Sequence, residues 1–114
     1  MAVVSKFKNK LTPAVGNSWT TVYLAPVGKD SYIIQLDISD PNNSGVQVSI
    51  RITDTSASQT CYIVQAAPVP PGSALQVIDG QKMVVEATDF VEVKCETLGE
   101  TVDVTISLIE DVNS

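Results

Sequence analysis

The feature that most constrains the fold of this chain is an alternation of apolar and polar residues with a period of two. A period of two is the signature of a β-strand with one buried face, and no segment shows the 3.6-residue period of an amphipathic helix. The alternation is clearest in residues 46–53. Inward side chains are predicted at Val46, Val48, Ile50 and Ile52, and outward ones at Gln47, Ser49, Arg51 and Thr53.

Similar runs recur along most of the chain. Together with residues 46–53 they predict about eight strands, at residues 18–25, 31–39, 61–67, 73–78, 81–87, 90–97 and 101–109. Pro, Gly, Asn and Asp lie between the runs, which is turn chemistry. Asp79-Gly80 separates two of the runs and predicts a two-residue hairpin. Strands at this spacing predict an all-β, antiparallel β-sandwich with a jelly-roll-like arrangement.

Other runs allow specific faces to be predicted. One face of each run is expected to carry these residues: Tyr32, Ile34, Leu36 and Ile38; Val91, Val93 and Cys95; Val102, Val104, Ile106 and Leu108. The opposite faces are rich in Thr, Ser, Gln and acids. Such faces suit solvent or a polar contact between subunits.

Length and charge divide the chain into three parts. Its 114 residues suit one domain. We expect an extended N-terminal arm over residues 1–17, a sandwich over residues 18–111 and a short tail over residues 112–114. The net charge is −6, of which the first ten residues contribute +3 and the remainder −9. The acidic body argues against nucleic-acid binding.

The basic arm has two interpretations. It is either a frayed, solvated terminus or a segment that docks on the acidic surface of a neighbour. Phe7 lies between Lys6 and Lys8, with Lys10 close by, and a single bulky apolar residue in such an arm suits a pocket on a partner. Trp19 and Tyr23 are expected to share one strand face, where they either cover the edge of the core or anchor a partner.

Nothing in the sequence predicts catalysis, and we expect no cofactor. The chain has no histidine, which removes the commonest general base. Glu92 and Glu96 would lie on one strand face about 13 Å apart, which is wider than a glycosidase pair. An acidic surface is the simpler interpretation.

A metal site is not expected either. Asp37, Asp40, Asn42 and Asn43 offer oxygen ligands for calcium, but they lack the spacing of a known calcium loop, and a turn requires the same residue types. Cys61 and Cys95 are expected to be reduced and buried, with a disulfide as the alternative. The sequence does not establish whether the two thiols lie close together.

The hydropathy pattern gives no membrane or secretion signal. No apolar run approaches the roughly 20 residues of a spanning helix. No apolar segment follows the N-terminal lysines as in a secretory signal. We therefore expect a protein that is used where it is made or is delivered as part of a particle.

Three stretches resemble a family of small virion proteins of tailed phages. These are TTVYLAPVGKDSYI (residues 20–33), DISDPNNSGVQVSIRI (residues 37–52) and VPPGSALQVIDGQKMVVEATDFVEV (residues 69–93). TVDVTISLIE (residues 101–110) also fits, so the resemblance covers residues 18–110 and leaves out the basic arm.

The resemblance implies a non-enzymatic β-sandwich subunit of a virion assembled in the host cytoplasm. A capsid decoration (cement) protein is expected first. It would bind the major capsid protein and copies of itself, as a trimer, and its arm would contact a neighbour. A neck, tail or fibre subunit is the alternative within a virion. A carbohydrate-binding module for host attachment is the alternative from another class, with Trp19 as its one Trp.

Overall fold

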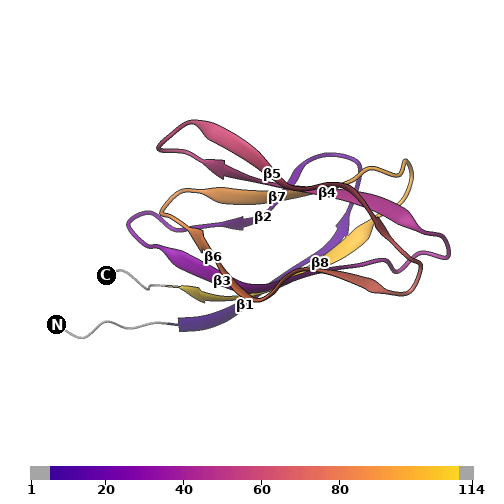
Figure 1. Ribbon diagram of the computed structural model, residues 1–114, viewed down its shortest axis with the longest axis horizontal. Coiled ribbons are helices and arrows are strands. Elements are labelled where there is room, and N and C mark those ends of the chain that lie inside the picture. Colours follow the sequence, from indigo (N-terminus) through magenta and orange to yellow (C-terminus); the bar gives the residue numbers. More distant parts are fainter. Residues whose placement is uncertain (1–5, 111–114) are drawn as a thin grey trace.

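The computed structural model describes residues 6–110, and the side chains of these except at positions 6 and 79–81. They form eight strands: β1 (Lys6–Val15), β2 (Thr20–Leu24), β3 (Ser31–Ser39), β4 (Val46–Asp54), β5 (Gln59–Val69), β6 (Ala74–Val85), β7 (Phe90–Cys95) and β8 (Val102–Glu110). Figure 1 shows the strands in two stacked layers, with short loops between them. Over residues 6–110 there is no helix, in agreement with the predicted all-β class.

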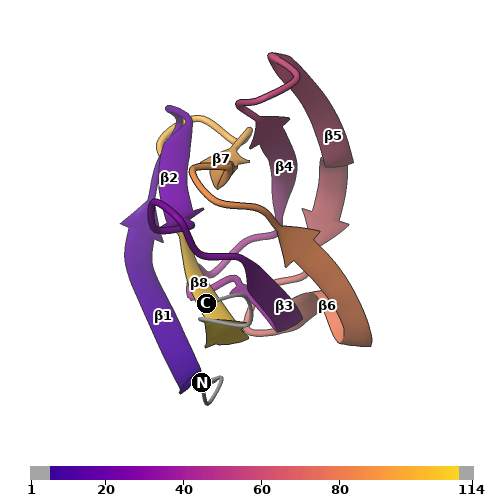
Figure 2. The same ribbon diagram turned by 90° about the vertical axis from the view of Figure 1, so that its left-hand side faces the viewer.

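The two layers are four-stranded antiparallel sheets. Sheet A has the strand order β1-β8-β3-β6, and sheet B has the order β2-β7-β4-β5. This arrangement is a jelly roll, so the sequence-based prediction of the fold class is confirmed. In Figure 2 the edge strands β1 and β2 lie at the left of the molecule and the edge strands β5 and β6 at the right.

The core lies between the sheets and consists of β-branched and other aliphatic side chains. The predicted inward faces of β4, β7 and β8 are confirmed, because the residues predicted to face inward there are fully buried, apart from half-buried Ile52. Ser49 is also buried, although its place in the alternation predicted an outward position. Its hydroxyl lies under a bulge of β5 and accepts a hydrogen bond from the backbone N–H of Ala66 (2.9 Å).

The predicted face of β3 is only half right, because the strand contains a β-bulge. Ile33 pairs with Leu108 of β8 and Gln35 pairs with Ser107, so Ile34 has no partner residue. The extra residue reverses the alternation. Ile33 is therefore buried with Leu36 and Ile38, whereas Tyr32 and Ile34 are only half-buried.

The predicted hairpin at Asp79-Gly80 is wrong. β6 runs through both residues as one strand, pairing with β3 on each side of them. Ile33 pairs with Met83 and Gln35 with Asp79, so three residues of β6 lie opposite Ile34. A glycine in a strand often marks such an irregularity. Pairing with β3 along both halves overrides the local tendency to turn.

The predicted N-terminal arm is also corrected in part. Residues 6–15 form β1, which pairs with β8 from Lys6↔Glu110 to Val15↔Val102. The sandwich thus includes residues 6–15, which precede its predicted start at residue 18, and Val15 belongs to its core. The prediction failed here because β1 is an edge strand with lysines, the residue type that commonly protects a sheet edge from pairing. Residues 1–5 and 111–114 lie outside the described part of the chain.

Candidate interaction surfaces

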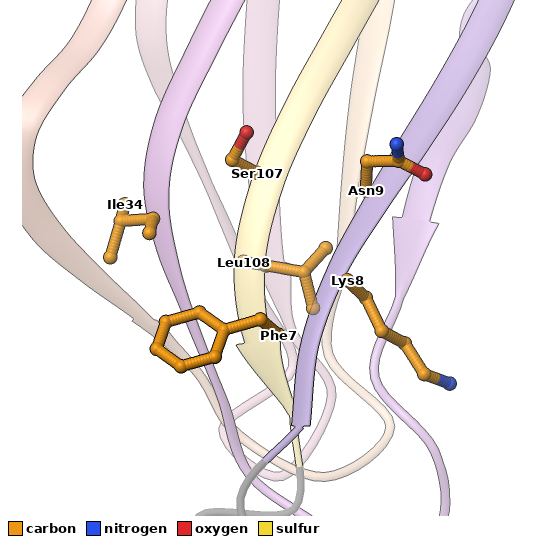
Figure 3. Close-up of a pocket in the computed structure, with 6 residues that line it drawn as sticks. All are labelled: Phe7, Lys8, Asn9, Ile34, Ser107 and Leu108. Atoms are coloured by element: carbon orange, nitrogen blue, oxygen red, sulfur yellow. The ribbon is translucent and has the colours of Figure 1, made fainter.

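Phe7 is the most exposed aromatic side chain of the described residues, with 79% of its surface open to solvent. Phe7 and Lys8 point to opposite sides of β1, as Figure 3 shows. Phe7 lies on the outer face of sheet A, and Lys8 on the side of buried Leu108, its partner in β8. A shallow groove of about 590 Å³ lies beside Phe7 and is lined by Phe7, Lys8, Asn9, Ile34, Ser107 and Leu108 (Figure 3).

The strand register places Phe7 at the end of an apolar row that crosses all four strands of sheet A. Phe7 pairs with Ile109, Ile109 with Tyr32, and Tyr32 with Val84. We call these four residues the outer row. Ile109 and Tyr32 are half-buried and Val84 is 51% exposed. Because the opposite face of the sheet packs on the core, the outer row faces away from it, and no other layer within residues 6–110 covers it.

The next row along the same face is different. Asn9 pairs with Ser107, and Ser107 with Gln35, so polar side chains follow directly. Leu11 lies further along the same face of β1, pairs with Thr105 and is 59% exposed, so apolar side chains are concentrated at the end of the sheet where β1 begins but also occur beyond the polar row. A contiguous apolar strip with a polar border is characteristic of a protein contact surface.

The predicted shared face of Trp19 and Tyr23 is wrong, because β2 also contains a bulge. Thr21 pairs with Glu92 and Tyr23 with Val91, so Val22 is the extra residue. Tyr23 is turned into the sandwich and is only 6% exposed. It cannot act as an exposed aromatic contact, whereas Trp19 stays on the outer face of sheet B.

Trp19 is held among cationic and aromatic side chains. The Cζ atom of Arg51 lies 4.0 Å from the centroid of the Trp19 ring, and the Nζ atom of Lys94 lies 5.3 Å from it. The ring of Tyr62 is 5.9 Å away, centroid to centroid, and tilted by 56°. Cations attract the face of an indole ring, so these contacts stabilise Trp19 where it lies.

Acidic partners neutralise these two cations. The Nε atom of Arg51 donates to Glu92 (2.7 Å), and the Nζ atom of Lys94 lies 3.4 Å from Glu96. Ser49 donates to the other oxygen of Glu96 (2.6 Å), and this hydrogen bond holds the pKa of Glu96 below its ordinary value. Each carboxylate of the predicted pair, Glu92 and Glu96, therefore has its own partner.

A buried polar cluster that the sequence did not predict joins the two sheets. The Tyr23 hydroxyl lies 2.6 Å from the hydroxyl of Ser31 and donates to Glu110 (2.7 Å). Lys8 forms an ion pair with the same carboxylate (2.7 Å). Burial raises the pKa of Tyr23 well above its ordinary value of 10. We call Lys8, Tyr23, Ser31 and Glu110 the latch, because they connect β1, β2, β3 and β8.

A second group lies in the loops at the same end of the sandwich as the latch and carries three acids. Carboxylate oxygens of Asp54, Glu86 and Asp89 lie within 4.8 Å of one another. Asp89 accepts a hydrogen bond from the N–H of Thr55 (3.1 Å), and Asp54 accepts from Ser56. The group closes loops and has exposed members, and acidic groups of this kind are common on protein surfaces.

Two of the residues considered as calcium ligands, Asp40 and Asn42, form the hydrogen bonds of a turn. One oxygen of Asp40 accepts hydrogen bonds from both the backbone N–H (2.8 Å) and the side-chain amide (2.7 Å) of Asn42. The same amide donates to the carbonyl oxygen of Thr101 (2.8 Å). Asp37 lies on β3 and accepts from Gln35 (2.8 Å). These bonds tie loop 40–45 to the sandwich.

The two cysteines are both free. Cys95 is fully buried, in agreement with its prediction, and burial raises the pKa of its thiol. Cys61 is exposed on β5, so its predicted burial is wrong. The error arises because the first residues of β5 extend beyond the core and are exposed on both faces.

Comparisons with known proteins give a fold likeness. No family model matches the chain, and no curated protein matches it. A solved structure described as "Bacillus endospore appendages form a novel family of disulfide-linked pili" is similar, with a TM-score of 0.56 and 16% sequence identity. The alignment covers 97% of this chain and 88% of the other.

At this identity the likeness shows the fold alone. The neighbour belongs to a structural appendage and is not a phage protein, so the resemblance to phage virion proteins stays a prediction. No helix in residues 6–110 is long and apolar enough to cross a membrane.

Proposed function

We propose that the protein is a non-enzymatic structural subunit that assembles with copies of itself into a larger particle or filament. The observation that carries the proposal is the outer row, a solvent-facing apolar strip across all four strands of sheet A. A chain with a net charge of −6 gains nothing in solubility from exposing Phe7 and Val84. Burial against a second copy gives these side chains a role.

Two further observations support this proposal. The polar groups in close contact on sheet B are paired with each other, as in Arg51 with Glu92, which suits a surface more than a reactive site. The chain also shares its fold with a protein of Bacillus endospore appendages, described as disulfide-linked pili. The shared fold makes self-assembly a reasonable starting hypothesis.

Within this class, we retain a capsid decoration subunit of a tailed phage as the first specific candidate and a neck, tail or fibre subunit as the second. Both rest on the resemblance of residues 18–110. Binding to major capsid protein and a trimeric state belong to the same proposal. Gold-labelled antibody against the protein, viewed on purified particles, tests it. Label over heads supports decoration, label on tails supports the second candidate, and unlabelled particles would argue against a virion role.

A carbohydrate-binding module is less favoured on a specific observation. Sugars stack on open aromatic faces, but the guanidinium of Arg51 lies over the ring of Trp19. A sugar would have to displace a cation that Glu92 also holds in place. A glycan array comparing the wild type with Trp19→Ala would reveal such binding.

Point substitutions test the outer row better than truncation, because removal of residues 1–12 would delete most of β1. Phe7→Ser combined with Val84→Thr removes apolar area while keeping a β-branched residue at position 84. The matched control is Leu98→Ser combined with Val27→Thr, since these side chains are 85% and 83% exposed in loops.

Self-association is measured by analytical ultracentrifugation across a range of concentrations. Burial of a large apolar side chain contributes about 1.5–3 kcal/mol, so the outer-row variant is expected to associate at least tenfold more weakly. The loop variant is expected to match the wild type. Equal behaviour of both variants, or a wild type that stays monomeric at high concentration, would contradict the proposal.

A further inference from the structure

The sandwich has two open sides, and they differ in charge. One side is formed by the edge strands β1 and β2, and the other by the edge strands β5 and β6 (Figure 2). β1 carries Lys6, Lys8, Lys10 and Pro13, and β2 is only five residues long. Lysine, proline and short strand length all discourage pairing with a strand of another molecule, so this side is protected against edge-to-edge association.

The side formed by β5 and β6 lacks such charges over most of its length. No charged residue occurs among the 24 residues from Thr55 to Ile78, although 18% of the chain is charged. This uncharged window contains the whole of β5 and the first five residues of β6. An exposed edge without charges is a template for strand pairing.

The first part of β5 is also exposed on both faces. Gln59, Thr60, Cys61 and Tyr62 are all exposed, although successive side chains of a strand point to opposite sides. This segment pairs residue for residue with β4, from Asp54↔Gln59 to Arg51↔Tyr62. Figure 1 shows the β4–β5 hairpin reaching beyond the rest of the sandwich. Within residues 6–110 no strand pairs with its outer edge.

The second part of β5 is unsuited to pairing. The register shifts at Ile63 and again at Gln65 and Ala66, where Ala66 has a positive φ of 53°. Bulges of this kind twist an edge away from a partner strand. Residues 59–62 are therefore the straight part of the edge that remains open.

We propose that residues 59–62 of β5 pair antiparallel with the same residues of a second copy, so that sheet B continues from one molecule into the next. This inference rests on the proposed function and names one contact through which it operates. A two-fold contact places identical residues opposite or near one another. Like charges directly opposite in a sheet are destabilising, so the lack of charge in residues 59–62 suits a strand that pairs with itself.

The net charge of the chain also favours a second copy as the partner of the β5 edge. Two copies with a charge of −6 each repel one another, and the repulsion is reduced where the pairing strand itself is uncharged and its nearest charged neighbours, Asp54 and Arg51 of β4, have opposite signs. A partner selected by charge would use the lysine-bearing side or an acidic face. The uncharged edge of β5 fits a copy of itself, held by backbone hydrogen bonds with alternate side chains packed across the pair.

The outer row and the β5 edge lie on different sheets, so one molecule can use both at once. Two separate self-complementary contacts on one subunit produce an open chain of molecules instead of a closed dimer. The two contacts together would therefore give linear or lattice assembly from a single kind of subunit.

The β5 contact can be tested by cross-linking through a cysteine that the chain already has. Cys61 is exposed within the pairing segment, whereas Cys95, the other cysteine, is fully buried. Treatment of the reduced protein with a short bismaleimide is expected to link two chains through Cys61. The product is a denaturant-resistant dimer on a gel, and Cys61→Ser is expected to abolish it.

Matched lysine variants separate edge pairing from general charge effects. Gln59→Lys places a charge on the edge of β5, and Gln47→Lys places the same charge on central strand β4, where Gln47 is also exposed. In the proposed pair, residue 59 of one copy lies opposite residue 62 of the other, so each new lysine lies at an end of the contact. Lysine on an edge strand discourages pairing, and association should weaken about fivefold. Gln47→Lys is expected to behave as the wild type in both the cross-linking yield and the ultracentrifuge.

The outer-row variant distinguishes failure of this inference from failure of the proposed function. In Phe7→Ser/Val84→Thr, the Cys61-linked dimer should still form at high protein concentration, although in lower yield than in the wild type, because the β5 edge is unchanged but lacks the support of the outer row. A wild type that assembles without Cys61 linkage, or equal effects of the two lysine variants, would overturn β5 pairing and leave the proposed function standing. A wild type that neither assembles nor cross-links would overturn both.

Discussion

Replacement of Tyr23 by Phe removes one oxygen atom from the centre of the latch. The Tyr23 ring stays compatible with its buried position, since only 6% of the residue is exposed. The substitution removes two hydrogen bonds, to Ser31 (2.6 Å) and to Glu110 (2.7 Å). Because these bonds connect β2 of sheet B to β3 and β8 of sheet A, their loss should weaken the joint between the layers.

The expected loss of stability follows from the hydrogen-bond partners that Tyr23 loses. A hydrogen bond to a charged group contributes about 1.5–3 kcal/mol, and a neutral one about 0.5–1.5 kcal/mol. Lys8 still pairs with Glu110 in the variant, which offsets part of the loss. We expect the free energy of unfolding to fall by about 2–3 kcal/mol, which would lower the melting temperature by roughly 10–15 °C for a domain of this size.

The pH dependence has a definite sign. The pKa of Tyr23 is raised above the value of 10 that the unfolded chain has, so the folded state holds its proton more tightly. The corresponding stability is fully present below pH 10 and is lost as the pH rises further, by up to about 1.4 kcal/mol per pH unit. Tyr23→Phe should lack this contribution, so the stabilities of wild type and variant should converge at high pH.

Urea denaturation at pH 7 and at several values above pH 10 tests both points. Tyr62→Phe is the matched control, because Tyr62 is 53% exposed on the outer face of sheet B and should change stability by less than about 0.5 kcal/mol. If Tyr23→Phe were no more destabilising than Tyr62→Phe, the latch would not join the sheets. If the difference in the free energy of unfolding between wild type and Tyr23→Phe stayed constant above pH 10, the raised pKa of Tyr23 would be refuted.

Three other measurements test separate parts of the structure. Ser49→Ala should lower the free energy of unfolding by about 1–2 kcal/mol in urea denaturation, because the N–H of Ala66 loses its acceptor, whereas Ser44→Ala in an exposed loop should have little effect. A thiol reagent such as Ellman's should modify one cysteine, Cys61, in the folded protein and a second, Cys95, only after denaturation; fast modification of both would contradict the burial of Cys95. Self-association should strengthen as salt rises from about 0.05 to 0.5 M, because salt screens the repulsion between chains of net charge −6, and weakening by salt would indicate that ion pairs hold the copies together.

The sequence predicted the fold well wherever the alternation of residues was unbroken. β7 and β8 have no bulge in their alternation, and their buried residues match the predicted ones, apart from Glu110 at the end of β8. β4 also follows the pattern, except that Ser49 is buried and Ile52 is only half-buried. Turn residues between these strands located the chain reversals, since Pro, Gly, Asn and Asp permit the required backbone angles.

The candidate interaction surfaces were poorly predicted because β-bulges determine which side chains of a strand face outward. A single extra residue in β2 turns Tyr23 inward and leaves Trp19 outside, and a single extra residue in β3 brings Tyr32 to the outer row. Bulges have no firm signature in one sequence, since they depend on which strand pairs with which. Partners such as Tyr23 and Glu110 are 87 residues apart, so only the folded chain brings them together.

The β5 edge illustrates how little pairing surface an assembling subunit requires. Only residues 59–62 are both straight and open, because bulges twist the remainder of the strand. A contact of this length is weak by itself, which keeps isolated subunits from aggregating through their edges. In an assembly with many copies, the same contact becomes more stable. When each molecule is also held through its outer row, the β5 contact forms at a high effective concentration. Weak contacts of two kinds can therefore give a stable assembly from subunits that stay separate when dilute.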